Sequence, residues 1–494
     1  MSSIAPALTR DIAPTAIIGL DDVLKGGLTR HRLYLVEGAP GSGKTTLAMQ
    51  FLRSAAGRDE PVLYVTLSET EEELRSVALS HGWTMEGVTI HELRPTEATI
   101  DPEEQYTMFH ASEVELSATI KAVLDIIDTL RPTCVVFDSL SELRLLAGSA
   151  LRYRRQILAL KHHLGVRHCT TMLLDDMTAG DQDLQVQSIA HGVIRLEPLS
   201  PEYGTERRRL RVVKFRGVPF RSGFHDYIIR YGGIDVFPRL VASEHRDVAS
   251  RVKHSSGIHG IDQLIGGGIE EGTSTLIVGA AGTGKSTLAT QFAVAAASRG
   301  SRAAMFVFDE NPGTLISRCT ELGIDLAGGI ASGSVTLQQI DPAELSPGEF
   351  VQAVQHAVTE QRASVIVIDS LNGYLNAMPG ERFLTIQLHE LLMYLGQQSV
   401  ATIMIGAHQG LIGAAMQTPV DASYLADAVI LLRYFEAKGD VRQAISVMKK
   451  RGSRHERTIR EFSLDSGGIH VGEPLREFRG VLTGVPVYEG SGQR

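Results

Sequence analysis

The sequence predicts an α/β fold built twice in tandem, in which each copy is a mostly parallel sheet flanked by helices. Residues 19–52 recur at residues 260–293 without a gap, glycines included. Within each copy, continuous apolar runs alternate with helical stretches, which is typical of parallel sheets covered on both faces. We therefore expect two domains, residues 1–245 and 246–494, with a polar linker near 238–255.

The elements are expected in the same order in both copies. In the first copy we expect strands at 33–37, 62–66, 134–138 and 171–174, a helix at 45–54, and hairpin-like segments over 208–230. In the second copy we expect strands at 276–278, 303–307, 365–369 and 401–405, a helix at 286–298, and hairpin-like segments over 441–471. Apolar runs of this length between helical stretches read as buried strands.

Composition narrows the class of protein. Its 494 residues, 43% of them hydrophobic and 21% charged, suit two globular domains. A net charge of −9 argues against a dominant nucleic-acid surface, and the basic run at 206–211 reads as a solvated strand or turn. No apolar run is long enough to span a membrane, no leader is evident, and three scattered cysteines suit the reducing cytoplasm.

The strongest chemical signal is a phosphate-binding loop in each copy. Residues 38–45 and 279–286 both match GxxxxGK[ST], and each follows an apolar strand and precedes a helix. Glycines let backbone N–H groups wrap phosphates, and the lysine reaches the β- and γ-phosphates. The predicted ATP-binding residues are Gly38, Gly41, Ser42, Gly43, Lys44, Thr45, Thr46, Gly279, Gly282, Thr283, Gly284, Lys285, Ser286 and Thr287.

Two aspartates are expected to complete Mg²⁺ sites. Asp138 and Asp369 each end an apolar strand, where a carboxylate holds the ion of a phosphate-binding site. The hydroxyls of Thr45 and Ser286 would bind the same ions. A plain helix N-cap is the alternative, because a serine follows each aspartate.

Acidic residues after the second strand of each copy, at 62–66 and 303–307, are candidate general bases. They are Glu69 in the first copy and the adjacent Asp309 and Glu310 in the second. Helix-capping acids are the alternative reading, since an acid often opens a helix.

Two basic pairs recur late in each copy, on strands whose alternation places both members on one face. Lys214 and Arg216 form the first pair, and Lys449 and Arg451 form the second. Such pairs could reach a phosphate across a subunit interface.

Longer segments resemble the KaiC family, whose members are two-domain circadian-clock ATPases and autokinases. They are 64–70, 135–143, 306–311, 341–350, 367–371 and 427–462. The resemblance implies two tandem RecA-like P-loop NTPase domains and a ring, normally a hexamer, with ATP and Mg²⁺ between subunits. It also implies that both basic pairs reach a neighbour's nucleotide, and that KaiB-like or other regulator proteins are partners.

Two departures from the family pattern bear on the chemistry of the sites. Ser68 stands where the family has a first glutamate, which predicts slower hydrolysis in the first copy. The family's phosphorylated Ser-Thr pair falls on Ser423 and Tyr424, so we expect autophosphorylation on Ser423 alone rather than a two-site cycle.

Three functions follow from these observations. The first is an ATPase whose second copy is a serine/threonine autokinase, acting as a ring in signalling or clock-like regulation. The second is an ATP-gated scaffold without kinase activity, and the third is a DNA-dependent ATPase of the RecA/RadA type, which the acidic composition disfavours.

Overall fold

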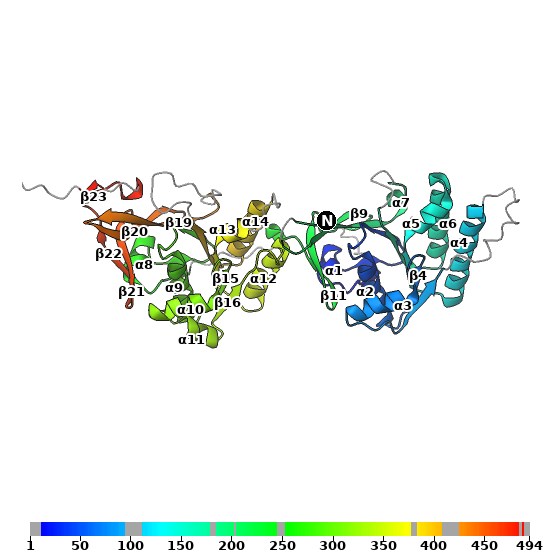
Figure 1. The fold of residues 1–494 in the computed structure, drawn as a ribbon, viewed down its shortest axis with the longest axis horizontal. Helices are drawn as coiled ribbons and strands as arrows, with labels where there is room; N and C mark the ends of the chain where they lie inside the picture. The colour runs from blue at the N-terminus through cyan, green and yellow to red at the C-terminus, as the bar shows by residue number, and fades with distance from the viewer. Residues whose placement is uncertain are drawn as a thin grey trace, which may run out of the picture. The chain divides into compact units, whose positions relative to one another are not determined.

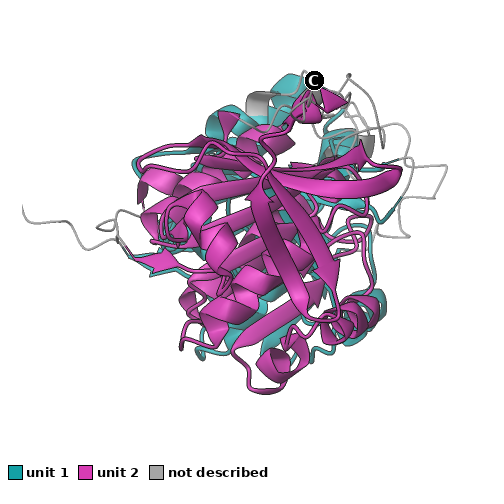
Figure 2. Cartoon of the chain, turned by 90° about the vertical axis from the view of Figure 1, so that its left-hand side faces the viewer, with its two compact units in different colours: residues 1–239 teal, residues 240–494 magenta. Residues whose placement is uncertain are grey.

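The computed structural model describes residues 11–93, 111–177, 184–201, 204–244, 252–376, 383–407, 424–483 and 487–488. The chain divides into two compact units, unit 1 over residues 1–239 and unit 2 over residues 240–494 (Figure 2). No helix among the described residues is long and apolar enough to cross a membrane.

Unit 1 is built on a nine-stranded sheet with the order β11-β10-β9-β8-β3-β7-β6-β4-β5. Figure 1 labels β4, β9 and β11 of this sheet. The strands from β5 to β8 run parallel, and β8 to β11 are antiparallel. The strands are β3 (Leu33–Gly38), β4 (Val62–Thr66), β5 (Val88–Glu92), β6 (Cys134–Asp138), β7 (Thr170–Asp175), β8 (Gly192–Leu199), β9 (Arg207–Phe215), β10 (His225–Arg230) and β11 (Gly233–Phe237).

Helices cover both faces of the unit 1 sheet. Alternate residues of β3 face opposite ways: Tyr34 packs with α2 and α3, whereas Leu35 packs with α4, α5 and α6. These strands are therefore apolar on both sides, which explains their continuous hydrophobic runs. The helices are α1 (Leu20–Val23), α2 (Lys44–Ala56), α3 (Glu71–Ser80), α4 (Ala111–Leu130), α5 (Leu140–Ala147), α6 (Ala150–Val166) and α7 (Leu184–Ile189).

Unit 2 repeats this plan with the strand order β16-β15-β17-β18-β14-β19-β20-β21-β22. The strands from β16 to β19 run parallel, and the last four are antiparallel. The strands are β14 (Ser274–Gly279), β15 (Ala303–Val307), β16 (Val335–Gln339), β17 (Val365–Asp369), β18 (Ala401–Ala407), β19 (Ala428–Ala437), β20 (Asp440–Lys450), β21 (Arg460–Asp465) and β22 (Gly468–Pro474).

The helices of unit 2 also lie on both sheet faces. One buried cluster joins the sheet to α8, α9, α10 and α11, and the other joins it to α12, α13 and α14. The helices are α8 (His259–Ile265), α9 (Lys285–Ala297), α10 (Pro312–Glu321), α11 (Leu326–Ala331), α12 (Pro347–Thr359), α13 (Leu371–Asn376) and α14 (Leu384–Gln397).

Three two-stranded ribbons and two short 3₁₀ turns complete the described elements. The ribbons are β1 (Ile12–Ala13) with β2 (Leu28–Thr29), β12 (Lys253–His254) with β13 (Ile269–Glu270), and β23 (Phe478–Arg479) with β24 (Val487–Tyr488). The turns are η2 (Ala242–Glu244) and η4 (Val481–Thr483).

The expected fold class is confirmed, because both copies form mostly parallel sheets flanked by helices. The expected strands at 62–66, 134–138, 303–307 and 365–369 have the same bounds in the structure. Both copies end in antiparallel strands where hairpin-like segments were expected.

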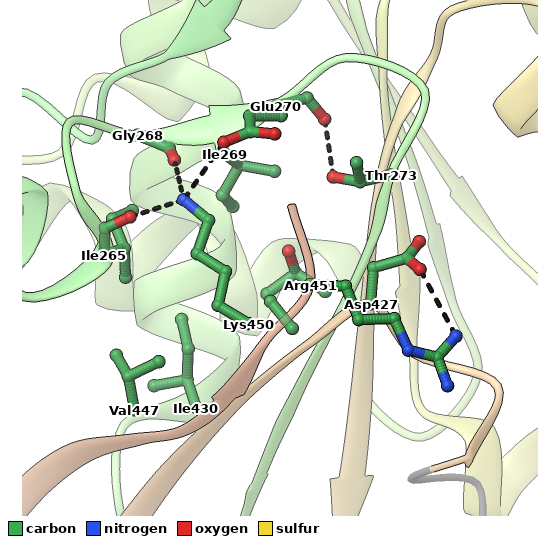
Figure 3. Close-up of a pocket in the computed structure, with 12 residues that line it drawn as sticks. Ile265, Gly268, Ile269, Glu270, Thr273, Asp427, Ile430, Val447, Lys450 and Arg451 are labelled. Atoms are coloured by element: carbon green, nitrogen blue, oxygen red, sulfur yellow. Dashed lines mark hydrogen bonds and ion pairs between the residues drawn. The ribbon is translucent and has the colours of Figure 1, made fainter. Parts of the chain in front are cut away.

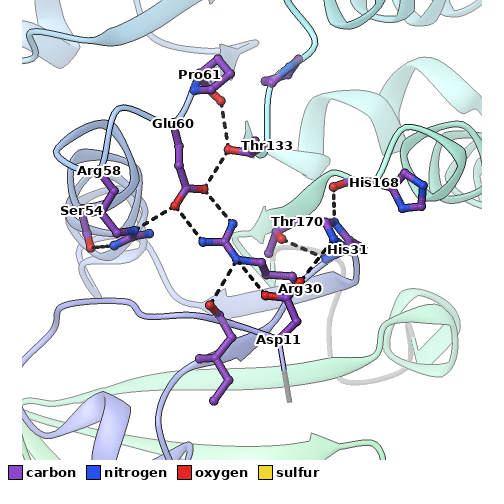
Figure 4. Close-up of polar contacts among 12 residues, drawn as sticks. Asp11, Arg30, His31, Ser54, Arg58, Glu60, Pro61, Thr133, His168 and Thr170 are labelled. Atoms are coloured by element: carbon purple, nitrogen blue, oxygen red, sulfur yellow. Dashed lines mark hydrogen bonds and ion pairs between the residues drawn. The ribbon is translucent and has the colours of Figure 1, made fainter. Parts of the chain in front are cut away.

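An ion pair fastens the segment that leads into β3 (Figure 4). Both terminal nitrogens of Arg30 lie 2.7 Å from the carboxylate oxygens of Glu60. Thr133, just before β6, donates to the same carboxylate at 3.0 Å. Hydrogen bonding from Arg30 outweighs burial and lowers the pKa of Glu60 to about 2. Glu60 thus links the segments that lead into three strands of the parallel sheet, β3, β4 and β6, of which β4 and β6 are neighbours.

Candidate nucleotide sites

Each phosphate-binding loop connects the carboxyl end of a central strand to the start of a buried helix. The first loop joins β3 to α2, and the second joins β14 to α9. Gly43 and Gly284 precede the helices with φ angles of 90° and 89°, a region that favours glycine. The loops therefore present backbone N–H groups and a helix N-terminus to the same point, which suits a phosphate group.

In unit 1 the expected Mg²⁺ ligands are in contact. Thr45, at the start of α2, donates a 2.8 Å hydrogen bond to Asp138 at the end of β6. Tyr64 of β4 donates to the same carboxylate oxygen at 2.6 Å. Asp138 is only 6% exposed, and this burial raises its pKa. A buried carboxylate beside a hydroxyl fits the oxygen chemistry of Mg²⁺, whose charge would favour the ionised form.

Unit 2 has the same arrangement. The side chain of Ser286 at the start of α9 hydrogen bonds to Asp369 at the end of β17. Asp369 is 7% exposed. Its pKa is raised to about 6, chiefly by burial and further by the nearby Asp309 and Glu310.

The two P-loop lysines are buried among loop carbonyls. Lys44 donates to the carbonyls of Gly38 at 2.8 Å and Ala39 at 3.1 Å, and Lys285 donates to that of Ala280 at 2.7 Å. Both lysines therefore lie within their loops, near the phosphate positions that the motif predicts.

Asp176 is a site residue that the sequence reasoning missed. It follows β7 directly, and its carboxylate lies 2.9 Å from Nζ of Lys44. Ser139 and Ser141 also donate to it, at 2.9 Å and 3.0 Å. Burial opposes ionisation, but the bonds from Lys44 and the serines prevail and lower its pKa. Its place just after an expected apolar strand was the available sequence signal, because ligands of α/β sheets bind outside the carboxyl ends of the strands.

Glu69 lies at the expected edge of the unit 1 site. Its backbone is held by Thr66, whose hydroxyl donates to the Glu69 carbonyl at 2.7 Å and accepts from its N–H at 3.0 Å. Among the described residues its buried Oε2 has no hydrogen-bond partner. Burial, followed by the negative charge of Asp138, raises its pKa. A half-buried carboxyl with raised pKa and a spare acceptor has the properties of a general base.

The acidic pair of unit 2 is held differently. Asp309 accepts a 2.5 Å hydrogen bond from Ser370, which follows Asp369. Glu310 pairs with Arg318 of α10 at 2.9 Å. Asp309 thus adjoins the predicted Mg²⁺ ligand, whereas Glu310 is turned toward the helix that follows it.

The basic pairs lie near the amino ends of the parallel strands, at the opposite end from the P-loops. Lys214 and Arg216 donate to the carbonyls of Gln187 and Ser188 in α7. Lys449 donates to the carbonyl of Ala426 at 2.7 Å, and Arg451 lies 3.6 Å from Asp427 (Figure 3). Lys214 pairs with Val193 near the amino end of β8. A parallel strand therefore separates each pair from its own P-loop by roughly 15 Å.

Ser423, the expected phosphorylation site, lies outside the described residues. Its neighbour Tyr424 is described and is 56% exposed.

Two P-loops at the carboxyl ends of parallel strands, each with a strand-end aspartate bonded to the loop hydroxyl, define a tandem RecA-like P-loop ATPase. The family model described as the KaiC ATPase matches residues 13–241 and again residues 254–476. The chain therefore belongs to the KaiC ATPase family.

Curated relatives match over nearly the full length of the chain. The circadian clock oscillator protein KaiC of Thermosynechococcus vestitus is 28% identical over 479 residues, covering 96% of this chain and 91% of the relative. The protein of the same name from Picosynechococcus sp. is 29% identical, covering 96% and 92%. Circadian clock protein KaiC3 of Synechocystis sp. is 27% identical, covering 96% and 94%.

Proposed function

We propose that this protein binds and hydrolyses ATP with Mg²⁺ in both units, and that unit 2 also phosphorylates the chain on Ser423. The observation that carries the proposal is the same in both units: a P-loop hydroxyl bonded to a buried strand-end aspartate. We further propose that copies of the chain form a cytoplasmic ring, normally a hexamer, that acts in signalling or clock-like regulation. KaiB-like or sensor proteins are the proposed partners.

The proposed hydrolysis in unit 1 assigns one role to each side chain. Lys44 binds the β- and γ-phosphates, and Thr45 with Asp138 holds the Mg²⁺ ion, which when bound neutralises phosphate charge. Glu69 accepts a proton from the attacking water through its unpartnered oxygen. Lys44 already has a carboxylate partner in Asp176. We infer that nucleotide binding transfers the lysine from Asp176 to phosphate.

The proposed kinase reaction in unit 2 replaces water by the Ser423 hydroxyl. Asp309 or Glu310 takes the hydroxyl proton, the serine oxygen bonds to the γ-phosphorus, and ADP leaves. Lys285 binds the phosphates, while Ser286 and Asp369 hold Mg²⁺. Asp309 is the better-placed base, because it bonds to Ser370 next to Asp369 while Glu310 is paired with Arg318.

The ring follows from where the basic pairs lie. The basic pairs lie near the amino ends of the parallel strands, away from the P-loops of their own units, and this supports the proposal that they contact nucleotide held by another copy. They are Lys214, Arg216, Lys449 and Arg451. A cation supplied across an interface stabilises the charge of phosphoryl transfer. ATP would then promote assembly, because it binds both copies at once.

Mass spectrometry after incubation with Mg-ATP tests the kinase proposal. We expect phosphate on Ser423 in the parent protein and none in the Lys285→Ala variant. The Lys44→Ala variant is the matched control, and it should keep Ser423 phosphorylation if it still assembles. ATP hydrolysis without phosphate on any serine or threonine would contradict the kinase assignment.

A second candidate is an ATP-gated scaffold without kinase activity. The observation in its favour is that both candidate bases of unit 2 already have partners. Asp309 accepts a hydrogen bond from Ser370, and Glu310 forms an ion pair with Arg318. In that case ATP would drive assembly while Ser423 stays unmodified, which the same experiment distinguishes.

A further inference from the structure

A cavity at the amino-terminal edge of the unit 1 sheet gathers positively charged side chains. Its volume is about 140 Å³, and its polar lining includes Arg32, Lys161, His191 and Arg216. Arg32 and His191 directly precede β3 and β8, Lys161 lies in α6, and Arg216 follows β9. The P-loop lies at the other end of β3, so this cavity is separate from the chain's own nucleotide site.

The cations of the cavity bind only backbone carbonyls among the described residues. Lys161 donates to Ile189 at 2.7 Å, Arg216 donates to Ser188 at 2.9 Å, and Arg32 donates to His31 at 3.2 Å. A carboxylate approaches the rim, where Asp11 lies 3.6 Å from Nε2 of His31. The arginines and the lysine themselves lack a carboxylate partner within this described part of the chain, so their charge is not balanced locally.

The cavity also holds polar atoms without partners. Nε2 of His191 and Oγ1 of Thr171 are buried and make no hydrogen bond within the described residues. Both residues line the cavity. Burial lowers the pKa of His191, and Arg32, Arg216, Lys161 and Lys214 lower it further. Unsatisfied buried polar atoms in a cationic cavity are the features that a bound anion would satisfy.

Unit 2 provides an internal comparison. In unit 1, Tyr34 pairs with Gly192, the residue after His191. In unit 2, the repeat counterpart of Tyr34 is Thr275, which pairs with Ala428, the residue after Asp427. Asp427 thus occupies the position of His191, and it pairs with Arg451, the counterpart of Arg216 (Figure 3). The cavity beside Asp427 measures only about 10 Å³. A carboxylate of the chain therefore supplies in unit 2 the negative charge that unit 1 lacks.

We propose that the unit 1 cavity binds an oxyanion of the phosphate class. Arginine forks match phosphate geometry, and lysine adds a point charge. The Thr171 hydroxyl and the His191 ring can donate to the remaining oxygens. A volume of about 140 Å³ is ample for such an ion, since one water needs about 10–15 Å³. This inference rests in part on the proposed function, which assigns Arg216 to nucleotide of another copy, but it requires neither hydrolysis nor autophosphorylation, and the phosphate titration tests it without nucleotide.

Inorganic phosphate is the probe for the first experiment. The full-length protein carries Lys44→Ala and Lys285→Ala, which remove phosphate binding by the P-loops. Phosphate is titrated into this protein at constant ionic strength while its thermal unfolding is followed. We expect a saturable rise in Tm, because a ligand of the native state stabilises it. His191→Asp supplies the unit 2 carboxylate, and it should weaken phosphate binding at least tenfold, as should Lys161→Met. Lys121→Met, an exposed lysine of α4, is the control and should change nothing.

Nuclear magnetic resonance of the His191 ring distinguishes two sources of the anion. A rise of its pKa with phosphate alone assigns the site to a free anion. A rise only with a non-hydrolysable ATP analogue, in assembled protein with intact P-loops, assigns the anion to nucleotide of a second copy. The proposal is overturned if His191 responds in neither arm, or if phosphate binding survives both His191→Asp and Lys161→Met.

Discussion

Asp138 and Asp369 are carboxylates buried at strand ends, and each is bonded to the hydroxyl at the start of the P-loop helix of its own unit. The sequence predicted these contacts because the motif spacing and the strand ends were both readable. It did not predict Asp176 or Tyr64, since their contacts with Lys44 and Asp138 depend on which strands become neighbours in the sheet. The different partners of Asp309 and Glu310 were equally beyond a reading of local sequence.

The raised pKa of Asp369 makes stability depend on pH. Its folded pKa is about 6 against an ordinary value of 3.8, so the folded state holds the extra proton between these values. Stability without Mg²⁺ therefore falls as pH rises from about 4 to 6, by up to about 3 kcal/mol. Urea unfolding should show the free energy of unfolding of Asp369→Asn gaining on that of the parent by about 2 kcal/mol between pH 4.5 and 7.5.

Mg-ATP supplies the control for that prediction. The ion favours the ionised carboxylate. At pH 7.5 Mg-ATP should therefore raise the free energy of unfolding of the parent more than that of Asp369→Asn, and so remove the stability difference between them. A stability difference between parent and Asp369→Asn that is independent of pH would contradict the account of this residue.

Glu69 is predicted to be the base of the unit 1 site. In a Lys285→Ala background, which isolates that site, Glu69→Gln should lower kcat by about 10²–10⁴-fold. Burial raises the pKa of Glu69. In the Lys285→Ala protein with Glu69 intact, ATPase activity should therefore fall on acidification at a higher pH than it would with an ordinary glutamate as the base. Glu72→Gln, an exposed neighbour in α3, is the control, and an equal effect of both substitutions would argue against the assignment.

At the scale of elements, the repeated strands and P-loop helices were predictable because they are long, apolar and bounded by glycine or aspartate. Full strand order was not, because order depends on crossover connections that leave no periodic signal. The difference in charge between the units at the amino ends of their parallel strands was not predictable from the sequence either. His191 and Asp427 become counterparts only when both sheets are paired residue by residue.

Helix α3 begins with a capping box directly after Glu69. Thr70 accepts from the N–H of Glu73, and the Glu73 carboxylate accepts from the N–H of Thr70 at 2.8 Å. Thr70→Ala should destabilise unit 1 by about 1 kcal/mol. Hydrogen exchange should show faster exchange in the first turn of α3, whereas Thr70→Ser should preserve protection. Unchanged exchange in Thr70→Ala would show that tertiary packing alone holds the helix start.

At the scale of the whole molecule, the duplicated plan gives each unit one candidate nucleotide site at the carboxyl ends of its parallel strands and one basic pair near their amino ends. The proposed ring would use this arrangement, because the basic pairs of each copy would then face the P-loops of the next copy. The repeat predicted the two sites, but the sheet pairing was needed to place the cations away from them.

Assembly is therefore expected to depend on nucleotide and on the basic pairs. Light scattering after gel filtration should show higher-order assembly with a non-hydrolysable ATP analogue and less assembly without it. Arg216→Ala together with Arg451→Ala should weaken assembly, while Arg75→Ala, an exposed arginine of α3, should not. Equal assembly with and without nucleotide would contradict nucleotide placed between subunits.

The stoichiometry of ATP binding tests the central claim most directly. Equilibrium binding of a non-hydrolysable ATP analogue with Mg²⁺ should saturate at two nucleotides per chain. It should saturate at one in Lys44→Ala and in Lys285→Ala, and the double variant should bind none. One nucleotide per parent chain, or undiminished binding in the double variant, would contradict an account in which each repeat forms its own ATP site.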